Sequence, residues 1–193
     1  MRIYVRAVLF ILCLVPLLYI ILLTLTGGLG ANPVERLTHF TGTWALNFIL
    51  ITLSVRPVRK LTGYLKIIQY RRMLGLYTFF YASLHFLCYF VLDQFFDFPE
   101  IIGDIIKRPY ITLGLSAFLL LIPLAVTSTK KMMARLGKHW KQLHRLIYIS
   151  ATLAVLHFLW LVKADIREPA IYGTILVSLL LLRVVRINQV KPV

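Results

Sequence analysis

The chain has 193 residues, of which 60% are hydrophobic. Soluble globular domains are usually only about 45–50% apolar. The formal net charge of +15 would suggest a nucleic-acid partner in a soluble protein. Here the basic residues gather in short connections between long apolar runs, so membrane orientation explains them and no nucleic-acid partner is expected. The composition excludes an ordinary soluble domain and predicts an all-α membrane protein embedded in the lipid bilayer.

Six apolar segments are long enough, or nearly so, to cross about 30 Å of hydrocarbon as helices. They span residues 3–26, 40–55, 73–96, 111–127, 143–162 and 170–185. The first is too long for the apolar region of a signal peptide, so it is expected to be a spanning helix. No connection is long enough for a soluble domain and no internal repeat is evident. Residues 1–193 are therefore expected to form one bundle of six transmembrane helices.

The distribution of lysine and arginine predicts how the bundle is oriented, because these residues are retained on the cytoplasmic side of a membrane. The connections at 56–72 and 128–145, together with the two chain ends, carry 17 of the 22 basic residues. The opposite connections carry the other five, which are Arg36, Lys107, Arg108, Lys163 and Arg167. Both termini are therefore predicted to be cytoplasmic.

Two histidines lie deep inside apolar segments, where an imidazole is costly unless something binds it. Counted from the ends of their segments, His85 and His157 lie about 18 Å and about 21 Å from one membrane face, at roughly 1.5 Å per residue. Two neutral imidazoles at one depth on neighbouring helices suit the two axial positions of a haem iron. The sequence thus predicts a membrane cytochrome of b type, although hydrogen bonding between helices would also satisfy such histidines.

A third histidine, His144, begins the fifth segment thirteen residues before His157. On a straight helix these two are roughly 20 Å apart along the axis and about 140° apart around it. A second haem at His144 therefore needs a distorted helix or another partner helix, and an ordinary polar flank is the alternative. Arg71 and Arg72 match its depth on the third segment. Arginine is a poor iron ligand, but its fork suits a haem propionate or a flavin phosphate.

The roles of the remaining histidines and of the neighbouring aromatic residues stay open. His39 precedes the second segment and could contact a quinone or a partner, whereas His139 lies in a basic loop and is expected to be solvated. Phe86, Tyr89 and Phe158 flank the two deep histidines. They either line the edge of a haem or simply pack between helices.

No motif in the chain encodes a nucleotide-binding module, since it has neither a GxGxxG turn after a strand nor a Walker glycine loop. Electrons must then come from the lipid phase or from a separate protein. The competing hypothesis is a small proton-coupled transporter that uses buried histidines as a relay. Broken helices in repeated halves would favour transport, and no such pairing is evident.

Five motifs occur in order along almost the whole chain. They are GGLGANPVERLTHFTG at Gly27–Gly42, RRMLGLYTFFYASLHF at Arg71–Phe86, KRPYITLG at Lys107–Gly114, TSTKKMMARLGKHWKQLHRLIY at Thr127–Tyr148 and LHFLW at Leu156–Trp160. Taken together, they resemble the MsrQ family, the membrane subunit of the bacterial methionine sulfoxide reductase system. This family lies within the ferric-reductase-like transmembrane superfamily.

The resemblance implies a haem b cytochrome of the bacterial inner membrane that also carries FMN. It implies electron transfer from the quinone pool, or from a flavin reductase, to the periplasmic molybdopterin subunit MsrP. That partner would carry out the catalytic reduction of methionine sulfoxide. The haem ligands of the family fall on His85, His144 and His157. The superfamily has two histidines on each of two helices, whereas the third segment here has only His85, so the resemblance implies one haem or two.

Overall fold

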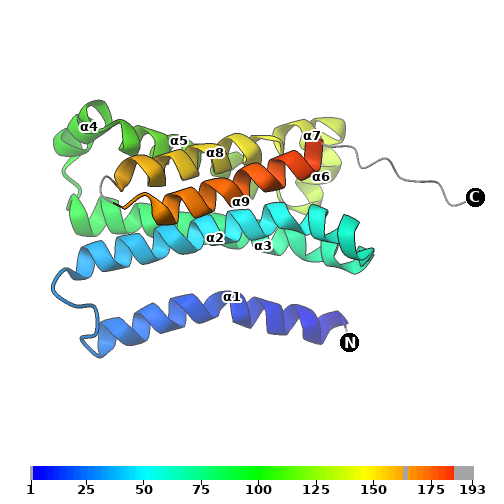
Figure 1. Cartoon of the computed structure of the whole chain (residues 1–193), viewed down its shortest axis with the longest axis horizontal. Coiled ribbons are helices and arrows are strands. Elements are labelled where there is room, and N and C mark those ends of the chain that lie inside the picture. The colour runs from blue at the N-terminus through cyan, green and yellow to red at the C-terminus, as the bar shows by residue number, and fades with distance from the viewer. Residues whose placement is uncertain (1, 163–164, 185–193) are drawn as a thin grey trace, which may run out of the picture.

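The computed structural model describes residues 2–162 and 165–184, and helices make up all of the regular structure in these ranges. Long helices run side by side to form an elongated bundle (Figure 1). The first half of the chain comprises α1 (Arg2–Leu25), α2 (Pro33–Thr62), the 3-10 helix η1 (Leu65–Tyr70), α3 (Arg71–Leu87) and the π-helix η2 (Cys88–Asp93). The second half comprises α4 (Phe98–Lys107), α5 (Pro109–Val126), α6 (Lys130–Leu136), α7 (Lys138–Leu143), α8 (Leu146–Leu161) and α9 (Arg167–Val184).

Four stretches of the described residues are long and apolar enough to cross a membrane. They are Tyr4–Leu25, Leu65–Asp93, Pro109–Val126 and Lys138–Leu161. Two further long helices, α2 with 30 residues and α9 with 18, lie alongside them in the bundle (Figure 1). The expected all-helical membrane architecture is therefore confirmed, while the count of six spanning helices stays a prediction.

The structure departs most from the predicted bounds at two helices. α2 begins at Pro33 because the side chain of Asn32 caps it, accepting a hydrogen bond from the backbone N–H of Glu35 at 3.3 Å. It continues to Thr62, where Gly63 in the left-handed conformation ends it. The predicted helix 143–162 is interrupted just after α7, and α8 begins only at Leu146.

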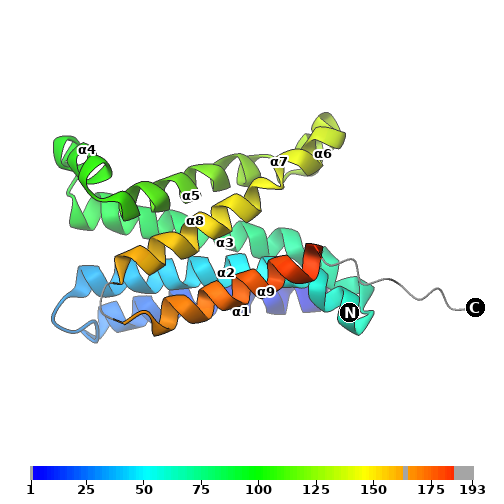
Figure 2. The ribbon, with the colours of Figure 1, turned by 45° about the horizontal axis from the view of Figure 1, so that its top comes forward.

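The helices pack as two closely associated pairs, α2 with α3 and α5 with α8 (Figure 2). Within the second pair, the buried hydroxyl of Ser150 donates to the carbonyl of Ala117 at 2.9 Å. α9 lies against α8 and α2, and the Tyr172 hydroxyl donates to Asn47 Oδ1 at 2.9 Å. One apolar core joins these helices; its buried residues are Leu46, Ile49, Leu50, Leu53, Leu121, Leu124, Ile147, Ala151, Val155 and Leu176.

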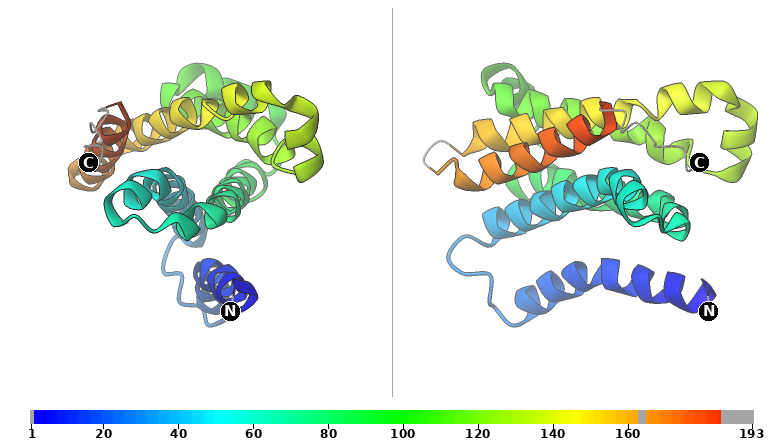
Figure 3. Two further views of the ribbon diagram at one scale, coloured as in Figure 1. Left: turned by 90° about the vertical axis from the view of Figure 1, so that its right-hand side faces the viewer. Right: turned by 45° about the vertical axis from the view of Figure 1, so that its right-hand side comes forward.

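α1 lies at one side of the bundle (Figure 3). Two tyrosines of α3 attach it to the other helices. Pro16 has no N–H, so the hydrogen-bond ladder of α1 is open at this point. Beside the gap, the buried Tyr81 hydroxyl donates to the carbonyl of Cys13 at 2.8 Å and accepts from the N–H of Leu17 at 3.2 Å. The Tyr77 hydroxyl donates to the carbonyl of Phe10 at 2.9 Å.

Acidic residues occur at only one end of the bundle, which we call the acidic end. They are Glu35, Asp93, Asp97, Glu100, Asp104, Asp165 and Glu168. The turn from α2 to α3 and the helices α6 and α7 lie at the opposite, basic end, as do the start of α1 and the end of α9 (Figure 1). Lys163, Val185, Arg186 and Lys191, which entered the predictions of charge and helix length, lie outside the described residues. The side of the membrane that each end faces stays a prediction.

Replacing Tyr81 with phenylalanine tests how α1 is held. Tyr81→Phe removes a hydroxyl that bonds two backbone atoms of α1, so we expect the free energy of unfolding to fall by about 1 kcal/mol or more. Thermal unfolding of the detergent-solubilised protein and amide exchange in α1 would report the loss. Tyr77→Phe is the matched control, since it removes only one such bond and should have a smaller effect. A larger effect of the control would contradict this account.

Candidate functional site

A cavity of about 450 Å³ lies between α2, α3, α5 and α8, with α4 at its acidic end. Its volume falls within the range of about 300–1,000 Å³ typical of sites for small molecules and cofactors. Most of the lining is apolar, and it includes Phe86, Tyr89 and Phe158, the aromatic residues that flank the two deep histidines. His85 and His157 both line this cavity, so the structure brings the two predicted ligands together.

The two imidazole rings lie close to each other across the cavity. Their centres are 6.1 Å apart and their planes make an angle of 70°. Two imidazoles that bind one metal from opposite sides at about 2.0–2.1 Å would have ring centres about 6.3 Å apart. The prediction that His85 and His157 share one depth is confirmed, and their spacing matches that of two axial ligands.

Backbone carbonyls fix the tautomer of both histidines. Nδ1 of His85 lies 2.8 Å from the carbonyl oxygen of Thr38, and Nδ1 of His157 lies 2.6 Å from that of Tyr110. A carbonyl oxygen only accepts, so each Nδ1 must carry the hydrogen and each Nε2 must hold a free lone pair. Such a bond at one ring nitrogen is what orients a histidine that binds metal through the other.

The same arrangement occurs twice in the chain at a constant spacing. Thr38, Gly42 and His85 are followed 72 residues later by Tyr110, Gly114 and His157. The sequence around each histidine repeats as well, since ASLHFL at 82–87 and AVLHFL at 154–159 agree at five of six positions. The prediction of no internal repeat is therefore wrong. Because α3 and α8 run in the same direction (Figure 2), equivalent residues meet at one depth.

An acidic side chain ties α4 to η2 at the acidic end of the cavity. Asp104 is only 3% exposed, and its carboxylate accepts from the Tyr89 hydroxyl at 3.2 Å and from Gln94 Nε2 at 3.1 Å. It also forms an ion pair with Arg108 at 3.1 Å, and the carboxylate raises the pKa of that guanidinium above its usual value. Arg108 and His39 line the cavity, so groups able to carry positive charge stand at this end.

His144 does not line the cavity and lies near the basic end of the bundle. Its Nε2 is 3.2 Å from the hydroxyl of Thr127, and its ring lies on that of Trp140 with the centres 4.0 Å apart. The Thr127 hydroxyl donates to the carbonyl of Pro123, so towards His144 it accepts, and Nε2 carries the hydrogen. In this arrangement His144 offers no Nε2 lone pair to a metal.

The two predicted arginines are also separate from the cavity. Arg71 is half-buried, and Arg56 and Arg183 lie close enough to repel its charge, whereas Arg72 is exposed. The guanidinium of Arg183 lies 4.3 Å from the centre of the Tyr148 ring. In the part of the chain that the structure describes, none of these arginines forms an ion pair with a carboxylate. A role for Arg71 and Arg72 in binding a cofactor stays a prediction.

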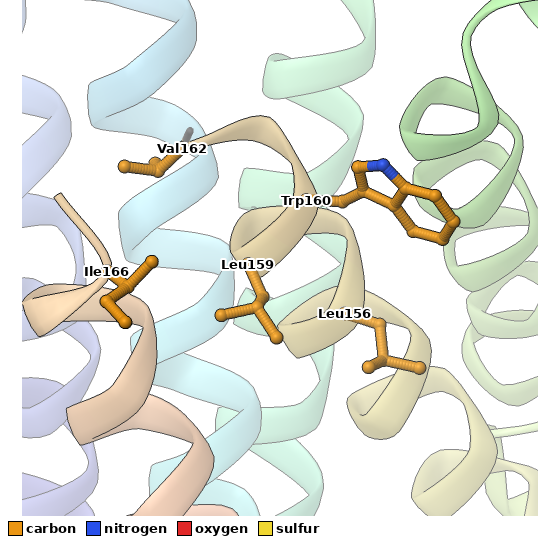
Figure 4. Close-up of a pocket in the computed structure, with 5 residues that line it drawn as sticks. All are labelled: Leu156, Leu159, Trp160, Val162 and Ile166. Atoms are coloured by element: carbon orange, nitrogen blue, oxygen red, sulfur yellow. The ribbon is translucent and has the colours of Figure 1, made fainter. Parts of the chain in front are cut away.

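The donor set of the cavity fits a haem better than a bare metal ion. Within residues 2–162 and 165–184, no group of three or more histidine, cysteine, aspartate or glutamate side chains could hold a metal. Two imidazoles leave most coordination positions of an iron free, and the four nitrogens of a haem macrocycle would fill them. A second hollow, of about 410 Å³, contains no titratable side chain; Leu156, Leu159, Trp160, Val162 and Ile166 line this open, apolar surface (Figure 4).

Comparisons with known proteins place the chain in a family. The family described as ferric reductase like transmembrane component matches residues 8–155. The protein-methionine-sulfoxide reductase heme-binding subunit MsrQ of Herminiimonas arsenicoxydans is 50% identical over 183 residues, which cover 93% of this chain and 84% of that protein. The chain belongs to the MsrQ family. The protein of the same name from Xanthomonas euvesicatoria pv. vesicatoria (strain 85-10) is 57% identical over 153 residues, which cover 79% and 70% of the two chains. No solved structure matches the chain.

Replacing Asp104 tests whether α4 is held over the cavity by this carboxylate. Asp104→Ala leaves Tyr89, Gln94 and Arg108 without their acceptor, so we expect the free energy of unfolding to fall by about 1–3 kcal/mol. Amide exchange in α4 should become faster, and thermal unfolding should begin at a lower temperature. Glu100→Gln, an exposed change on the same helix, is the control. Unchanged exchange in α4 after Asp104→Ala would contradict the assignment.

Proposed function

We propose that this protein is the haem-binding membrane subunit of a protein-methionine-sulfoxide reductase and that it holds haem b between His85 and His157. The observation that carries the proposal is the pair of imidazoles with centres 6.1 Å apart, each with Nδ1 bonded to a carbonyl. The relatives that are 50% and 57% identical to this chain carry the name of the heme-binding subunit of that reductase. Catalytic reduction of the sulfoxide would take place on a partner protein.

The residues of the cavity have distinct roles in this proposal. A haem supplies a reversible one-electron carrier, and the protein tunes it through axial ligation and burial. His85 and His157 would hold the haem iron through Nε2, and their Nδ1 bonds orient the rings and raise the basicity of Nε2. The apolar walls exclude water. At the acidic end, Arg108 and His39 can pair with the propionate groups.

We propose that electrons leave towards the acidic end, because the histidine cavity extends to α4 at that end. The acceptor is the periplasmic molybdopterin subunit MsrP. The described residues form helices without a nucleotide-binding fold, so the donor is a quinol in the bilayer or a separate flavin reductase. This direction requires the acidic end to face the periplasm.

The proposed topology follows from the proposed direction of electron transfer and from the charge distribution. Six helices, α1, α2, α3 with η2, α5, α8 and α9, cross the bacterial inner membrane, and both termini are cytoplasmic. The basic connections at 56–72 and 128–145 then lie on the cytoplasmic side. α4 is amphipathic, with Phe98, Ile102 and Ile106 exposed, and it lies at the periplasmic surface of the inner membrane, where lipid meets water.

We assign the basic end to a further cofactor, with FMN as the first candidate. The fork of Arg71 suits a flavin phosphate, and its neighbours Arg56 and Arg183 add positive charge. Arg72 is exposed and can contact the same anionic group from the cytoplasmic side. The alternative is a second haem bound by His144, which requires the contact of His144 with Thr127 to be replaced.

Substitution of the two histidines tests the ligation. His85→Ala and His157→Ala should each abolish the low-spin spectrum of this haem, because either change removes an axial ligand. The measurement is the dithionite-reduced absorption spectrum of purified protein, together with the ratio of haem to protein. His139→Ala, in the exposed basic segment, is the control and should keep the wild-type spectrum. Either ligand variant with a wild-type spectrum would overturn the pair, and a wild-type protein without haem would favour the proton-relay transporter.

The direction of electron transfer can be measured with the protein in vesicles. A quinol, or a flavin reductase with its reductant, should reduce the haem, whereas NADPH alone should not. Addition of the periplasmic reductase and methionine sulfoxide at the acidic end should then speed haem reoxidation. Rapid direct reduction by NADPH in a preparation free of other proteins would contradict this prediction. So would a prereduced haem that passes no electrons to the acceptor.

A further inference from the structure

A glycine of the neighbouring helix touches each of the two imidazoles. A Cβ atom on Gly42 of α2 would lie 2.9 Å from Nδ1 and 3.0 Å from Cε1 of His85. A Cβ atom on Gly114 of α5 would lie 2.9 Å and 3.0 Å from the same two atoms of His157. Any larger residue at these positions must push the ring, because interiors are close-packed and such contacts are too short. Each imidazole therefore lies directly against the backbone of its partner helix.

Backbone conformation does not explain these glycines. Both lie inside α-helices, where glycine is less favourable than alanine by about 1 kcal/mol, and neither has a positive φ. General helix packing does not require them either, as Gly75 of α3 shows. A Cβ there would meet only Thr52 Cγ2 at an ordinary 3.7 Å. What sets Gly42 and Gly114 apart is the imidazole ring in front of each.

The glycine and the carbonyl act on the same ring from one face of the same helix. Thr38, whose carbonyl accepts from His85 Nδ1, lies one helical turn before Gly42. Tyr110 and Gly114 stand in the same relation to His157. The carbonyl accepts a hydrogen bond from Nδ1. Because the glycine has no side chain, the ring can come close enough to the helix to form this bond. The two ring planes placed in this way make an angle of 70° with each other.

We propose that Gly42 and Gly114 are positioning residues that fix the axial imidazole planes nearly at right angles, and so set the electronic structure of the iron. This inference rests on the proposed haem at His85 and His157. Each imidazole donates π-electron density in one direction set by its plane. When the two planes are parallel, both imidazoles raise the energy of the same iron d orbital and so separate it in energy from its neighbour. Nearly perpendicular planes raise both alike and leave them close in energy, which makes a ferric low-spin centre highly anisotropic.

Electron paramagnetic resonance of the ferric wild-type protein tests the angle without any variant. Perpendicular planes predict a low-field signal of large anisotropy from the haem held by His85 and His157. The rhombic signal of parallel planes from that haem would overturn the proposal. The signal is assigned by its loss in His157→Ala. A wild-type protein that contains no haem would instead refute the proposed function itself, so the two failures are distinguishable.

Alanine substitution tests the glycines directly. In Gly42→Ala or Gly114→Ala the methyl group displaces the ring, so the low-field signal should shift towards that of parallel planes or broaden. Release of haem to an acceptor protein should become about 10–100-fold faster, as when a partner that orients a metal-bound histidine is removed. Gly75→Ala is the matched control on α3 and should leave both quantities unchanged. The proposal fails if both alanine variants keep the wild-type signal and release rate, or if Gly75→Ala changes them equally.

Discussion

The hydrogen bond from histidine Nδ1 to a backbone carbonyl is the constraint on which the rest of the site depends. In an apolar interior an imidazole must satisfy two nitrogens, and an unpaired polar group there costs several kcal/mol. The carbonyls of Thr38 and Tyr110 satisfy one nitrogen of each ring. Among the described residues no hydrogen bond to either Nε2 is found, so both lone pairs are free to bind the haem iron that we propose between the rings.

The position of this pair follows from the relation between the two helix hairpins. α2 with α3 and α5 with α8 run through the bundle in the same sense, so His85 and His157, 72 positions apart, lie side by side at one depth. An inverted arrangement, as in many transporters, would instead exchange the two ends of one hairpin. On the side of the cavity towards the basic end, the apolar core around Leu50 and Leu124 fills the space between the hairpins. The cavity is therefore displaced towards α4 and the acidic end.

The sequence predicted the depth of His85 and His157 because helix rise and segment ends suffice to calculate it. It did not predict the partners of these rings, since a backbone carbonyl leaves no signature in the residue type that carries it. Nothing in the residue type marks Gly42 and Gly114, because what sets them apart is the imidazole ring in front of each. The internal repeat was visible as ASLHFL and AVLHFL, but similarity is concentrated around the histidines. Elsewhere the surroundings of the hairpins differ, because α1 packs on the first hairpin whereas α9 packs on α8 of the second and on α2 of the first. Their residues differ accordingly.

The internal repeat does not extend to the basic end of the bundle. This difference bears on the second haem predicted at His144. The position equivalent to His144 in the first hairpin is Arg72, which lies 72 residues earlier. A guanidinium stays protonated and offers no lone pair to iron, so the symmetry that pairs His85 with His157 provides no second pair of imidazoles. The nearby arginines find no carboxylate, because every acidic residue of the chain belongs to the opposite end. The same repeat thus gives two different environments: a pair of imidazoles towards the acidic end, and at the basic end a cluster of positive charge suited to an anionic group.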